Sequence, residues 1–144
     1  MIRFYLGEEP ILKQVETFQC SDPKVLDYVF KNIEKMVVKK ANGSGGYGML
    51  IGATSSKSEI DEFKDIVKSN PNEYIAQPVV QLSTCPTFDG KTFSPRRVDL
   101  RPFVISGKTQ WVLPGGLTRV ALTEGSYVVN SSQGGGSKDT WVLE

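Results

Sequence analysis

The spacing of apolar residues predicts two amphipathic helices in the first half of the chain. A Ser-Asp-Pro tripeptide is typical of a helix start, and we expect a helix from about Asp22 to Lys35. Ser56 and Glu59 match a capping box, which places a second helix over Ser58 to Ser69. The two apolar stripes are Leu26, Val29, Phe30 and Ile33 in the first helix, and Ile60, Phe63, Ile66 and Val67 in the second.

Runs rich in β-formers predict strands elsewhere in the chain. We expect one strand over Met36 to Lys40 and another over Tyr47 to Ile51, and the glycine-rich loop between them would complete a hairpin. From Tyr74 onward the pattern is that of an antiparallel sheet, with a turn at Asp89-Gly90. The predicted class is α+β, with two helices packed on a glycine-rich β-hairpin and a mostly antiparallel sheet.

Alternation along the strand from Arg97 to Ile105 predicts one polar face and one buried face. The polar side would carry Arg97, Asp99, Arg101 and Phe103, and the buried side Val98, Leu100, Pro102 and Val104. Further along, we expect a strand over Ser126 to Asn130 and an anchored strand at Trp141 to Leu143. The segment SSQGGGSKD between them has the composition of a flexible linker.

The loop from Gly43 to Gly48 is the strongest candidate for a binding element. Glycine tolerates positive φ and has no Cβ, so successive main-chain N–H groups can form a concavity that accepts an anion. Lys39 and Lys40 precede the loop and point to opposite faces of their strand, so only one of them can face a ligand. Periodicity does not choose between the two lysines, and a plain glycine hairpin is the alternative interpretation.

Three phosphate-binding motifs can be compared with this loop. Gly43, Gly45 and Gly48 satisfy GxGxxG, but the dinucleotide fold needs a helix after the loop, and an apolar strand is predicted here. A Walker loop is excluded because no Gly-Lys-Ser/Thr closes the run. The strand-loop-strand context resembles the glycine loop of protein kinases, although in kinases the lysine follows the loop.

Composition narrows the possible functions. With 144 residues the chain suits one domain, and 17 basic against 16 acidic residues give no electrostatic footprint for nucleic acid or an anionic membrane. The chain has no histidine, which removes Ser-His-Asp and Cys-His nucleophilic arrangements but leaves phosphoryl transfer open. We expect Cys20 and Cys85 to be reduced and partly buried. No apolar run could span a bilayer and no signal peptide is present, so we expect a cytoplasmic protein.

Five segments taken together resemble the C-terminal part of the circularly permuted type 2 ATP-grasp proteins, relatives of the glutathionylspermidine synthase ligases. The segments are VVKKANGSGGYGM, YIAQPVVQLSTCPTF, RRVDLRPFVISG, VLPGGLTRVAL and VVNSSQGGGSKDTWVL. They cover almost the whole chain in order, so the resemblance favours nucleotide binding over a plain hairpin. It implies that the chain is an ATP-grasp half-domain.

The resemblance also implies roles for single residues. The lysine of the VVK strand contacts ATP phosphates in that family, which selects Lys39, and the glycine loop would close over the phosphates. Main-chain groups near Gln77, Val79 and Val80 would bind the adenine edge, and Arg119 would neutralise the γ-phosphate. The expected nucleotide-binding residues are Lys39, Gly43, Ser44, Gly45, Gly46, Tyr47, Gly48, Gln77, Val79, Val80 and Asn130, with the loop Gln133 to Asp139 flanking the same cleft.

Several of these residues have a structural alternative. Gln77 could hydrogen-bond within a strand end, and Asp99 with Arg101 could form a surface ion pair worth under about 1 kcal/mol. Arg119 lies in a strand that otherwise buries aliphatic residues, so it needs an anionic partner more than a surface arginine would. Arg97 replaces a residue that is commonly histidine in the family, and we do not count it as catalytic. Tyr47 could pack on the loop or on a ribose.

The resemblance implies a parent protein that is an ATP-dependent carboxylate-amine ligase acting through an acyl phosphate. Its Mg²⁺ ligands would lie in the N-terminal half that precedes this chain, together with sites for a carboxylate and an amine that the sequence does not identify. We therefore expect a C-terminal fragment, residues 1 to 144, that is inactive alone. The alternatives are a non-catalytic nucleotide-binding or protein-interaction scaffold and a β-rich nucleic-acid module, the latter disfavoured by charge.

Overall fold

The computed structural model describes residues 1–43, 46–130 and 134–143. Contacts between Cα atoms divide the chain into two compact units. The first unit holds Met1–Gly43 and Gly48–Val80, and the second unit holds the strands that follow residue 80. No helix in the described part of the chain has the length and apolar character needed to cross a membrane.

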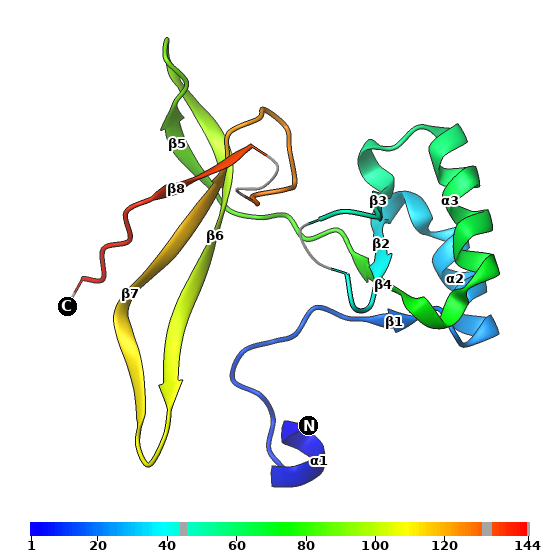
Figure 1. Ribbon diagram of the computed structural model, residues 1–144, viewed down its shortest axis with the longest axis horizontal. Coiled ribbons are helices and arrows are strands. Elements are labelled where there is room, and N and C mark those ends of the chain that lie inside the picture. The colour runs from blue at the N-terminus through cyan, green and yellow to red at the C-terminus, as the bar shows by residue number, and fades with distance from the viewer. Residues whose placement is uncertain (44–45, 131–133, 144) are drawn as a thin grey trace. The chain divides into compact units, whose positions relative to one another are not determined.

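The first unit is a four-stranded antiparallel sheet with two helices on one face (Figure 1). Its strand order is β1-β4-β2-β3, with every neighbouring pair antiparallel. Its helices and strands are α1 (Ile2–Leu6), β1 (Phe18–Gln19), α2 (Pro23–Lys31), β2 (Met36–Lys40), β3 (Met49–Ile51), α3 (Lys57–Ser69) and β4 (Tyr74–Pro78). Short 3-10 turns cover Ile33–Lys35, Gly52–Thr54 and Pro71–Glu73.

The core of the first unit lies between the sheet and helices α2 and α3. Val38 and Ala76 from the sheet are fully buried, as are Val29 of α2 and Val67 of α3. Because side chains alternate along a strand, burial of Met36 and Val38 leaves Val37 and Lys39 on the opposite face of β2. The helices thus cover one face of the sheet, and the other face carries the partly exposed residues.

Local signals in the sequence explain where the helices begin. The Asp22 carboxylate accepts a hydrogen bond from the Lys24 N–H at 2.9 Å and caps α2. Ser56 and Glu59 form the predicted capping box, in which the Ser56 N–H donates to the Glu59 carboxylate at 2.7 Å. The helix predicted to run to Lys35 ends as an α-helix at Lys31, because the chain tightens into a 3-10 turn before β2.

The hairpin predicted around the glycine loop is confirmed. Strands β2 and β3 pair antiparallel, with Lys39 opposite Met49 and Val37 opposite Ile51. The second strand starts at Met49 instead of Tyr47 because Gly48 has a φ of 63°, which interrupts the extended backbone. Ser44 and Gly45 of the predicted loop lie outside the described residues.

The second unit is another four-stranded antiparallel sheet, with strand order β5-β6-β7-β8. Its strands are β5 (Thr84–Phe88), β6 (Phe93–Ser106), β7 (Gln110–Ala121) and β8 (Gly135–Lys138). The turn predicted at Asp89-Gly90 is confirmed: the Lys91 and Thr92 N–H groups donate to the Asp89 carboxylate, and Gly90 has a φ of 99°. The predicted antiparallel second half is therefore correct.

The prediction that β6 has one buried face is wrong. Every residue from Leu100 to Pro114 in the β6–β7 hairpin is exposed, and Leu100 and Val104 are each more than half exposed. The buried aliphatic residues of this unit are instead Val120, Ala121 and Val129. The exposed apolar residues of the hairpin are Leu100, Phe103, Val104, Ile105, Trp111, Val112 and Leu113. We call residues 100–113 the apolar hairpin.

Two strands predicted near the C-terminus are also wrong. Ser126 to Asn130 is irregular because its backbone forms a turn, in which the Val128 N–H donates to the Ser126 hydroxyl at 3.0 Å. Trp141 to Leu143 is exposed coil, so no sheet anchors it. Part of the predicted linker forms β8 instead: Gly135 to Lys138 pairs with β7, where glycine allows close approach of the Val129 carbonyl.

Candidate functional site

Strand β2 places its two lysines on opposite faces of the first sheet. Lys40 lies on the helix-covered side, where its ammonium is 2.9 Å from the Glu73 carboxylate and 5.9 Å from the centre of the Tyr74 ring. The hydrogen bond and charge of Glu73 raise the pKa of Lys40. Lys39 is half-buried on the other face and makes no ion pair among the described residues. The structure thus distinguishes the two lysines that sequence periodicity could not.

The face of the first sheet that carries Lys39 is partly apolar. Register across the strands aligns Gln19, Ile75, Lys39 and Met49 in one row, and Gln77, Val37 and Ile51 in the next. We call these seven residues the open face. Its central members Ile75, Val37 and Ile51 are half-buried. A flat aliphatic surface beside a single ammonium group offers stacking area for a planar ring and one cation for a phosphate.

The residues predicted to bind adenine lie at the end of β4. The Gln77 side chain donates from Nε2 to the Thr17 hydroxyl at 2.9 Å, the strand-end hydrogen bond that was the structural alternative for this residue. The Val79 N–H donates to the Lys35 carbonyl at 3.0 Å, so this donor already has a partner. The main chain of Val80 makes no hydrogen bond among the described residues. Val80 thus differs from Val79, whose N–H has a partner among the described residues.

The described part of the glycine loop retains the geometry that only glycine adopts easily. Gly46 has a φ of 76° and Gly48 a φ of 63°. The Gly43 N–H donates to the Lys40 carbonyl at 3.2 Å, which tightens the turn after β2. Tyr47 has a mostly exposed side chain. These observations explain why glycines occupy the loop.

In the second unit, Arg119 forms a two-pronged ion pair with Asp99. The two residues lie opposite each other on β7 and β6, and the Arg119 Nε donates to Asp99 Oδ1 at 2.8 Å while Nη2 donates to Oδ2. The hydrogen bonds and charge of Asp99 raise the pKa of Arg119. The anionic partner that the sequence required for Arg119 is present within the chain. Asp99 forms its ion pair with Arg119 and not with Arg101, the partner that the sequence analysis considered for it.

Two further arginines, which the sequence analysis did not select, hold the segment after β7. The Arg97 guanidinium lies 3.7 Å from the centre of the Tyr127 ring and donates to the Gly125 carbonyl at 2.7 Å. Arg96 is buried and donates to the Leu122 carbonyl at 3.1 Å. Consecutive strand residues point to opposite faces, so an Arg-Arg pair supplies a guanidinium on each side. Two adjacent arginines in a predicted strand are therefore the sequence pattern that could have indicated these contacts.

Asn130 ends the segment that these arginines hold. Its carbonyl accepts the Gly135 N–H at 3.0 Å, which closes the turn into β8 beside the end of β7. A Cβ added at Gly135 would lie 2.6 Å from the Val129 carbonyl oxygen, so glycine is required there. Gln133, at the start of the predicted flanking loop, lies outside the described residues.

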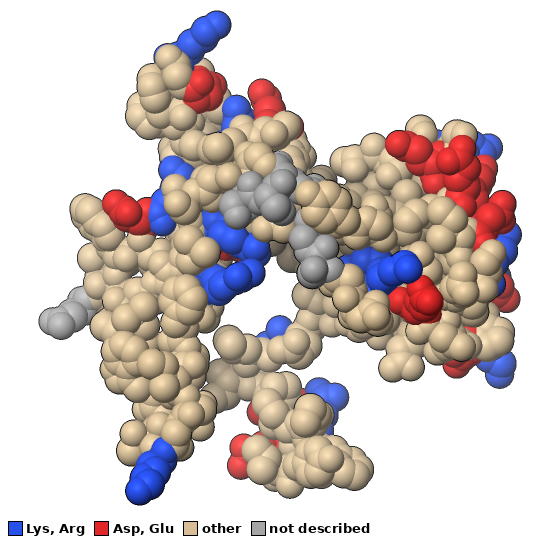
Figure 2. All heavy atoms as spheres, in the orientation of Figure 1, with Lys and Arg blue, Asp and Glu red and all other residues tan. Residues whose placement is uncertain are grey.

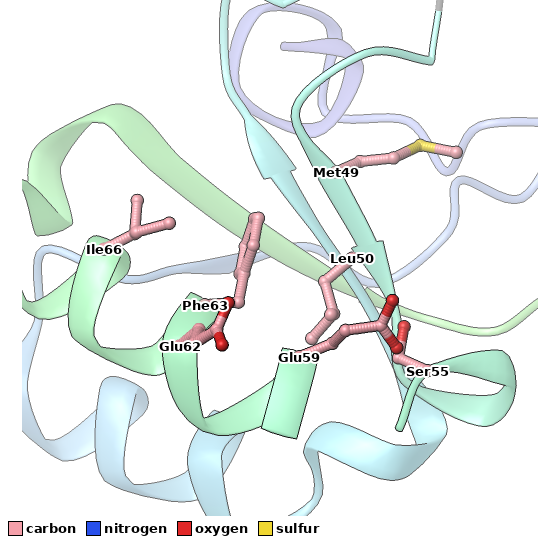
Figure 3. A pocket seen from close by; sticks show the side chains of 7 residues that line it. All are labelled: Met49, Leu50, Ser55, Glu59, Glu62, Phe63 and Ile66. Atoms are coloured by element: carbon pink, nitrogen blue, oxygen red, sulfur yellow. The ribbon is translucent and has the colours of Figure 1, made fainter. Parts of the chain in front are cut away.

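A groove on the first unit does not coincide with the predicted nucleotide residues. Figure 3 shows it between β3 and α3, with an empty volume of about 520 Å³. It is lined by Met49, Leu50, Ser55, Glu59, Glu62, Phe63 and Ile66. Its two carboxylates would repel a polyphosphate, and that of Glu59 is engaged in the cap of α3. Figure 2 shows acidic and basic side chains mixed over α3, which include the pairs Lys64–Asp61 and Lys68–Asp65.

The described residues offer no ready site for a divalent cation. No group of three or more His, Cys, Asp or Glu side chains among them could hold a metal ion. Asp99, the carboxylate that lies opposite Arg119 across β6 and β7, is paired with that arginine. The donor set of the described residues therefore does not fit Mg²⁺.

Comparison with known proteins places the chain in a family. The family model of circularly permuted ATP-grasp type 2 matches residues 1–121. An uncharacterised protein of Synechocystis is 52% identical over an alignment that covers all of this chain and 30% of that protein. An uncharacterised protein of Mycobacterium tuberculosis is 52% identical over 99% of the chain and 26% of its own length. A putative glutamate–cysteine ligase of Frankia casuarinae is 44% identical over 99% of the chain.

The match is continuous along this chain, whereas it covers only part of each relative. The chain spans less than a third of the Synechocystis and Mycobacterium proteins and 16% of the Frankia protein. The family model includes both lysines of β2, the glycine loop and Arg119. The chain therefore belongs to the circularly permuted ATP-grasp type 2 family.

Proposed function

We propose that this chain is the ATP-binding portion of an ATP-dependent carboxylate-amine ligase that acts through an acyl phosphate. Membership of the ATP-grasp family supports the use of ATP, and the Frankia relatives, both named as putative glutamate–cysteine ligases, support the ligase class. A closer relation to the glutathionylspermidine synthases is part of the proposal. The carboxylate and amine substrates are partners whose identities the chain does not specify.

The observation that carries the proposal is the position of Lys39 on the open face. Lys40 is paired with Glu73, so Lys39 is the β2 lysine whose ammonium would bind a phosphate. The aliphatic rows around Lys39 would support a planar ring, and Val80 has main-chain groups for its polar edge. Gly43, Gly46 and Gly48 with their neighbours in the loop would bring N–H groups to the phosphates.

In the second unit, Arg119 is proposed to neutralise the charge of the transferred phosphoryl group, with Asn130 as a flanking ligand. Among the described residues Arg119 uses two of its five N–H donors, both on Asp99, so three donors have no partner there and could bind an anion. We propose that Mg²⁺ is also required and that its ligands lie in an N-terminal half of the same protein.

The proposed location is the cytoplasm. Cys20 and Cys85 are both free thiols, which fits a reducing compartment. Burial raises the pKa of the Cys20 thiol, so this thiol stays protonated and unreactive at neutral pH.

Substitution of the two lysines tests the proposal. ATP binding would be measured by titration calorimetry in the longer parent protein, as wild type, as Lys39→Ala and as the matched control Lys40→Ala. Loss of a charge-assisted hydrogen bond should make Lys39→Ala bind about tenfold more weakly. Lys40→Ala should bind within about twofold of wild type, because its ammonium faces Glu73 and not the open face. Equal losses in both variants would exclude a specific role for Lys39.

The ligase step is tested in the longer parent protein. ADP release that depends on both a carboxylate and an amine is expected, and hydroxylamine should trap the activated carboxylate as a hydroxamate.

A second candidate function is a non-catalytic scaffold with a degenerate ATP-grasp fold. The observation that favours it is the Arg119–Asp99 pair, which gives this arginine an anionic partner within the chain. ATP binding without any acid- and amine-dependent ADP release in the parent protein would support the scaffold.

A further inference from the structure

Asp99 lies at the centre of a cationic face of the second sheet. Arg97 and Arg101 stand two positions before and after it on the same side of β6, and Arg119 faces it from β7. The face therefore carries three guanidinium groups and one carboxylate. Arg97 is engaged with Tyr127 and with the carbonyls of the segment after β7, so its direction is fixed by other contacts.

The ion pair with Asp99 fixes the orientation of the Arg119 guanidinium. Asp99 takes the edge of the guanidinium formed by Nε and Nη2, with one carboxylate oxygen on each nitrogen. Such two-pronged pairing restrains both the position and the plane of the guanidinium. The Nη1 edge has no hydrogen bond among the described residues, and the Arg119 side chain is 21% exposed. The ion pair thus holds the guanidinium, and with it the Nη1 edge, in one orientation.

We propose that Asp99 is a positioning residue that orients Arg119 so that its Nη1 edge receives a terminal phosphate group. This inference rests on the proposed function, because it refines how Arg119 meets its anion. The pairing has two opposed consequences for anion binding. The Asp99 charge weakens attraction of a phosphate to this face, whereas orientation removes the rotational freedom that Arg119 would otherwise lose on binding. The proposal states that orientation is the larger effect.

The two effects predict opposite signs for Asp99→Asn, which makes the proposal testable. Loss of the carboxylate adds one unit of positive charge but leaves a single acceptor oxygen for the guanidinium. If orientation dominates, tripolyphosphate should bind Asp99→Asn several-fold more weakly than wild type. Glu124→Gln is the matched control, because it makes the same charge change at an exposed position with no hydrogen bond among the described residues. Its affinity should equal that of wild type or exceed it slightly.

The experiment is an NMR titration of the 144-residue chain with tripolyphosphate and, separately, with orthophosphate. The Arg119 Nε–Hε signal reports on the guanidinium, and shifts of β6 and β7 amides show that the sheet is intact. Asp99→Glu is a second variant that keeps the charge but moves the carboxylate by one methylene. It should also bind tripolyphosphate more weakly, with a smaller preference for tripolyphosphate over orthophosphate than wild type.

Each outcome has one meaning. Tighter binding by Asp99→Asn would overturn the inference, because the carboxylate would then be a competitor of the phosphate. Unchanged affinity with a lower melting temperature would also overturn it, since Asp99 would be only structural. If the wild-type Arg119 signal does not respond to tripolyphosphate, the proposed role of Arg119 fails together with the inference. A response in wild type that is equal in both Asp99 variants would remove the inference alone.

Discussion

The two units reach stability by different means, although each is built on a four-stranded antiparallel sheet. The first unit buries a continuous cluster that includes Val29, Val38, Val67 and Ala76 between its sheet and two helices. The second unit has few buried aliphatic side chains, and Arg96 is among its most buried residues. The comparison shows that apolar burial fixes the first sheet, whereas hydrogen bonds from guanidinium groups to main-chain carbonyls fix the second.

This difference bears on how each proposed ligand residue is held. Lys39 projects from a sheet whose opposite face is packed against helices, so its backbone position is set by the core. Arg119 projects from a sheet in which polar contacts define the geometry, so its own direction depends on Asp99. Substitutions that alter packing should therefore act on the first unit, and substitutions of arginine or its partners should act on the second.

The largest effect is expected for Gly52→Ala in the first unit. A Cβ at this position would lie 1.8 Å from the Ile33 carbonyl oxygen, so the turn after β3 and the turn before β2 would be forced apart. The free energy of unfolding of the first unit should fall by about 3 kcal/mol or more. Hydrogen exchange of β2 and β4 amides measures it. Gly107→Ala is the control, because its Cβ would meet only the Thr109 carbonyl oxygen at 3.9 Å. Wild-type protection in Gly52→Ala would contradict the packing described here.

The second-largest loss of unfolding free energy is expected when a buried valine of the first unit is shortened, compared with an exposed valine of the second unit. Val38→Ala removes two methyl groups from a fully buried site and should cost about 2 kcal/mol of unfolding free energy. Val104→Ala removes the same groups from the apolar hairpin, where the side chain is 58% exposed, and should cost less than about 0.5 kcal/mol. Denaturant unfolding followed by amide signals of each unit gives both values. A larger loss for Val104 would mean that the hairpin is covered in solution.

Arg97→Met should destabilise the second unit by about 1–2 kcal/mol, because it removes hydrogen bonds to two carbonyls and the contact with the Tyr127 ring. Arg101→Met is the matched control. Its guanidinium is exposed and makes no hydrogen bond among the described residues, so its effect should stay within about 0.5 kcal/mol. Hydrogen-exchange rates of the β6 and β7 amides measure the stability of the second unit in both variants. Equal effects would show that the Arg97 contacts do not stabilise this sheet.

The smallest expected effect is a dependence on pH that a different carboxylate sets in each unit. Hydrogen bonds from Ser56 lower the pKa of Glu59 at the start of α3, and hydrogen bonds from Thr92 and Lys91 lower the pKa of Asp89 in the β5–β6 turn. A lowered pKa in the folded state stabilises fully above the ordinary pKa of the group, and the contribution is lost as the pH falls through the lowered value. Acid should therefore weaken each unit.

Two amide variants assign these losses. Glu59→Gln should reduce the acid sensitivity of α3 amides and leave the second unit unchanged, and Asp89→Asn should do the reverse. Amide exchange measured between neutral and acid pH gives both profiles. If either variant reduced the acid sensitivity of amide exchange in both units, the carboxylates would not act locally.

Local signals made most of the first unit predictable from sequence. The strand Met36 to Lys40, the capping box at Ser56 and the hairpin depend on neighbouring residues, and each is found as expected. The second unit was predicted less well because its strand boundaries depend on distant contacts. Gly135 lies in a strand because only glycine fits beside the Val129 carbonyl. This close approach depends on the tertiary fold, and no local sequence pattern predicts it.

The candidate site was predictable only in part for a similar reason. Alternation showed that Lys39 and Lys40 diverge, but the partner of Lys40 is Glu73, which pairing of β2 with β4 brings close. The pairing of Arg119 with Asp99 depends on the register of β6 and β7, which shifts between Pro102 and Val104. The roles of the glycine loop, Gln77, Val79, Val80, Arg119 and Asn130 in binding ATP stay predictions.

The exposed Trp111 of the apolar hairpin has a practical consequence for spectroscopy. Trp111 and Trp141 are the two tryptophans of the sequence, and both lie exposed in the second unit. Intrinsic tryptophan fluorescence therefore reports on that unit alone, and its emission should already resemble that of indole in water before unfolding begins. The first unit, which carries Lys39, would unfold without an optical signal at those wavelengths.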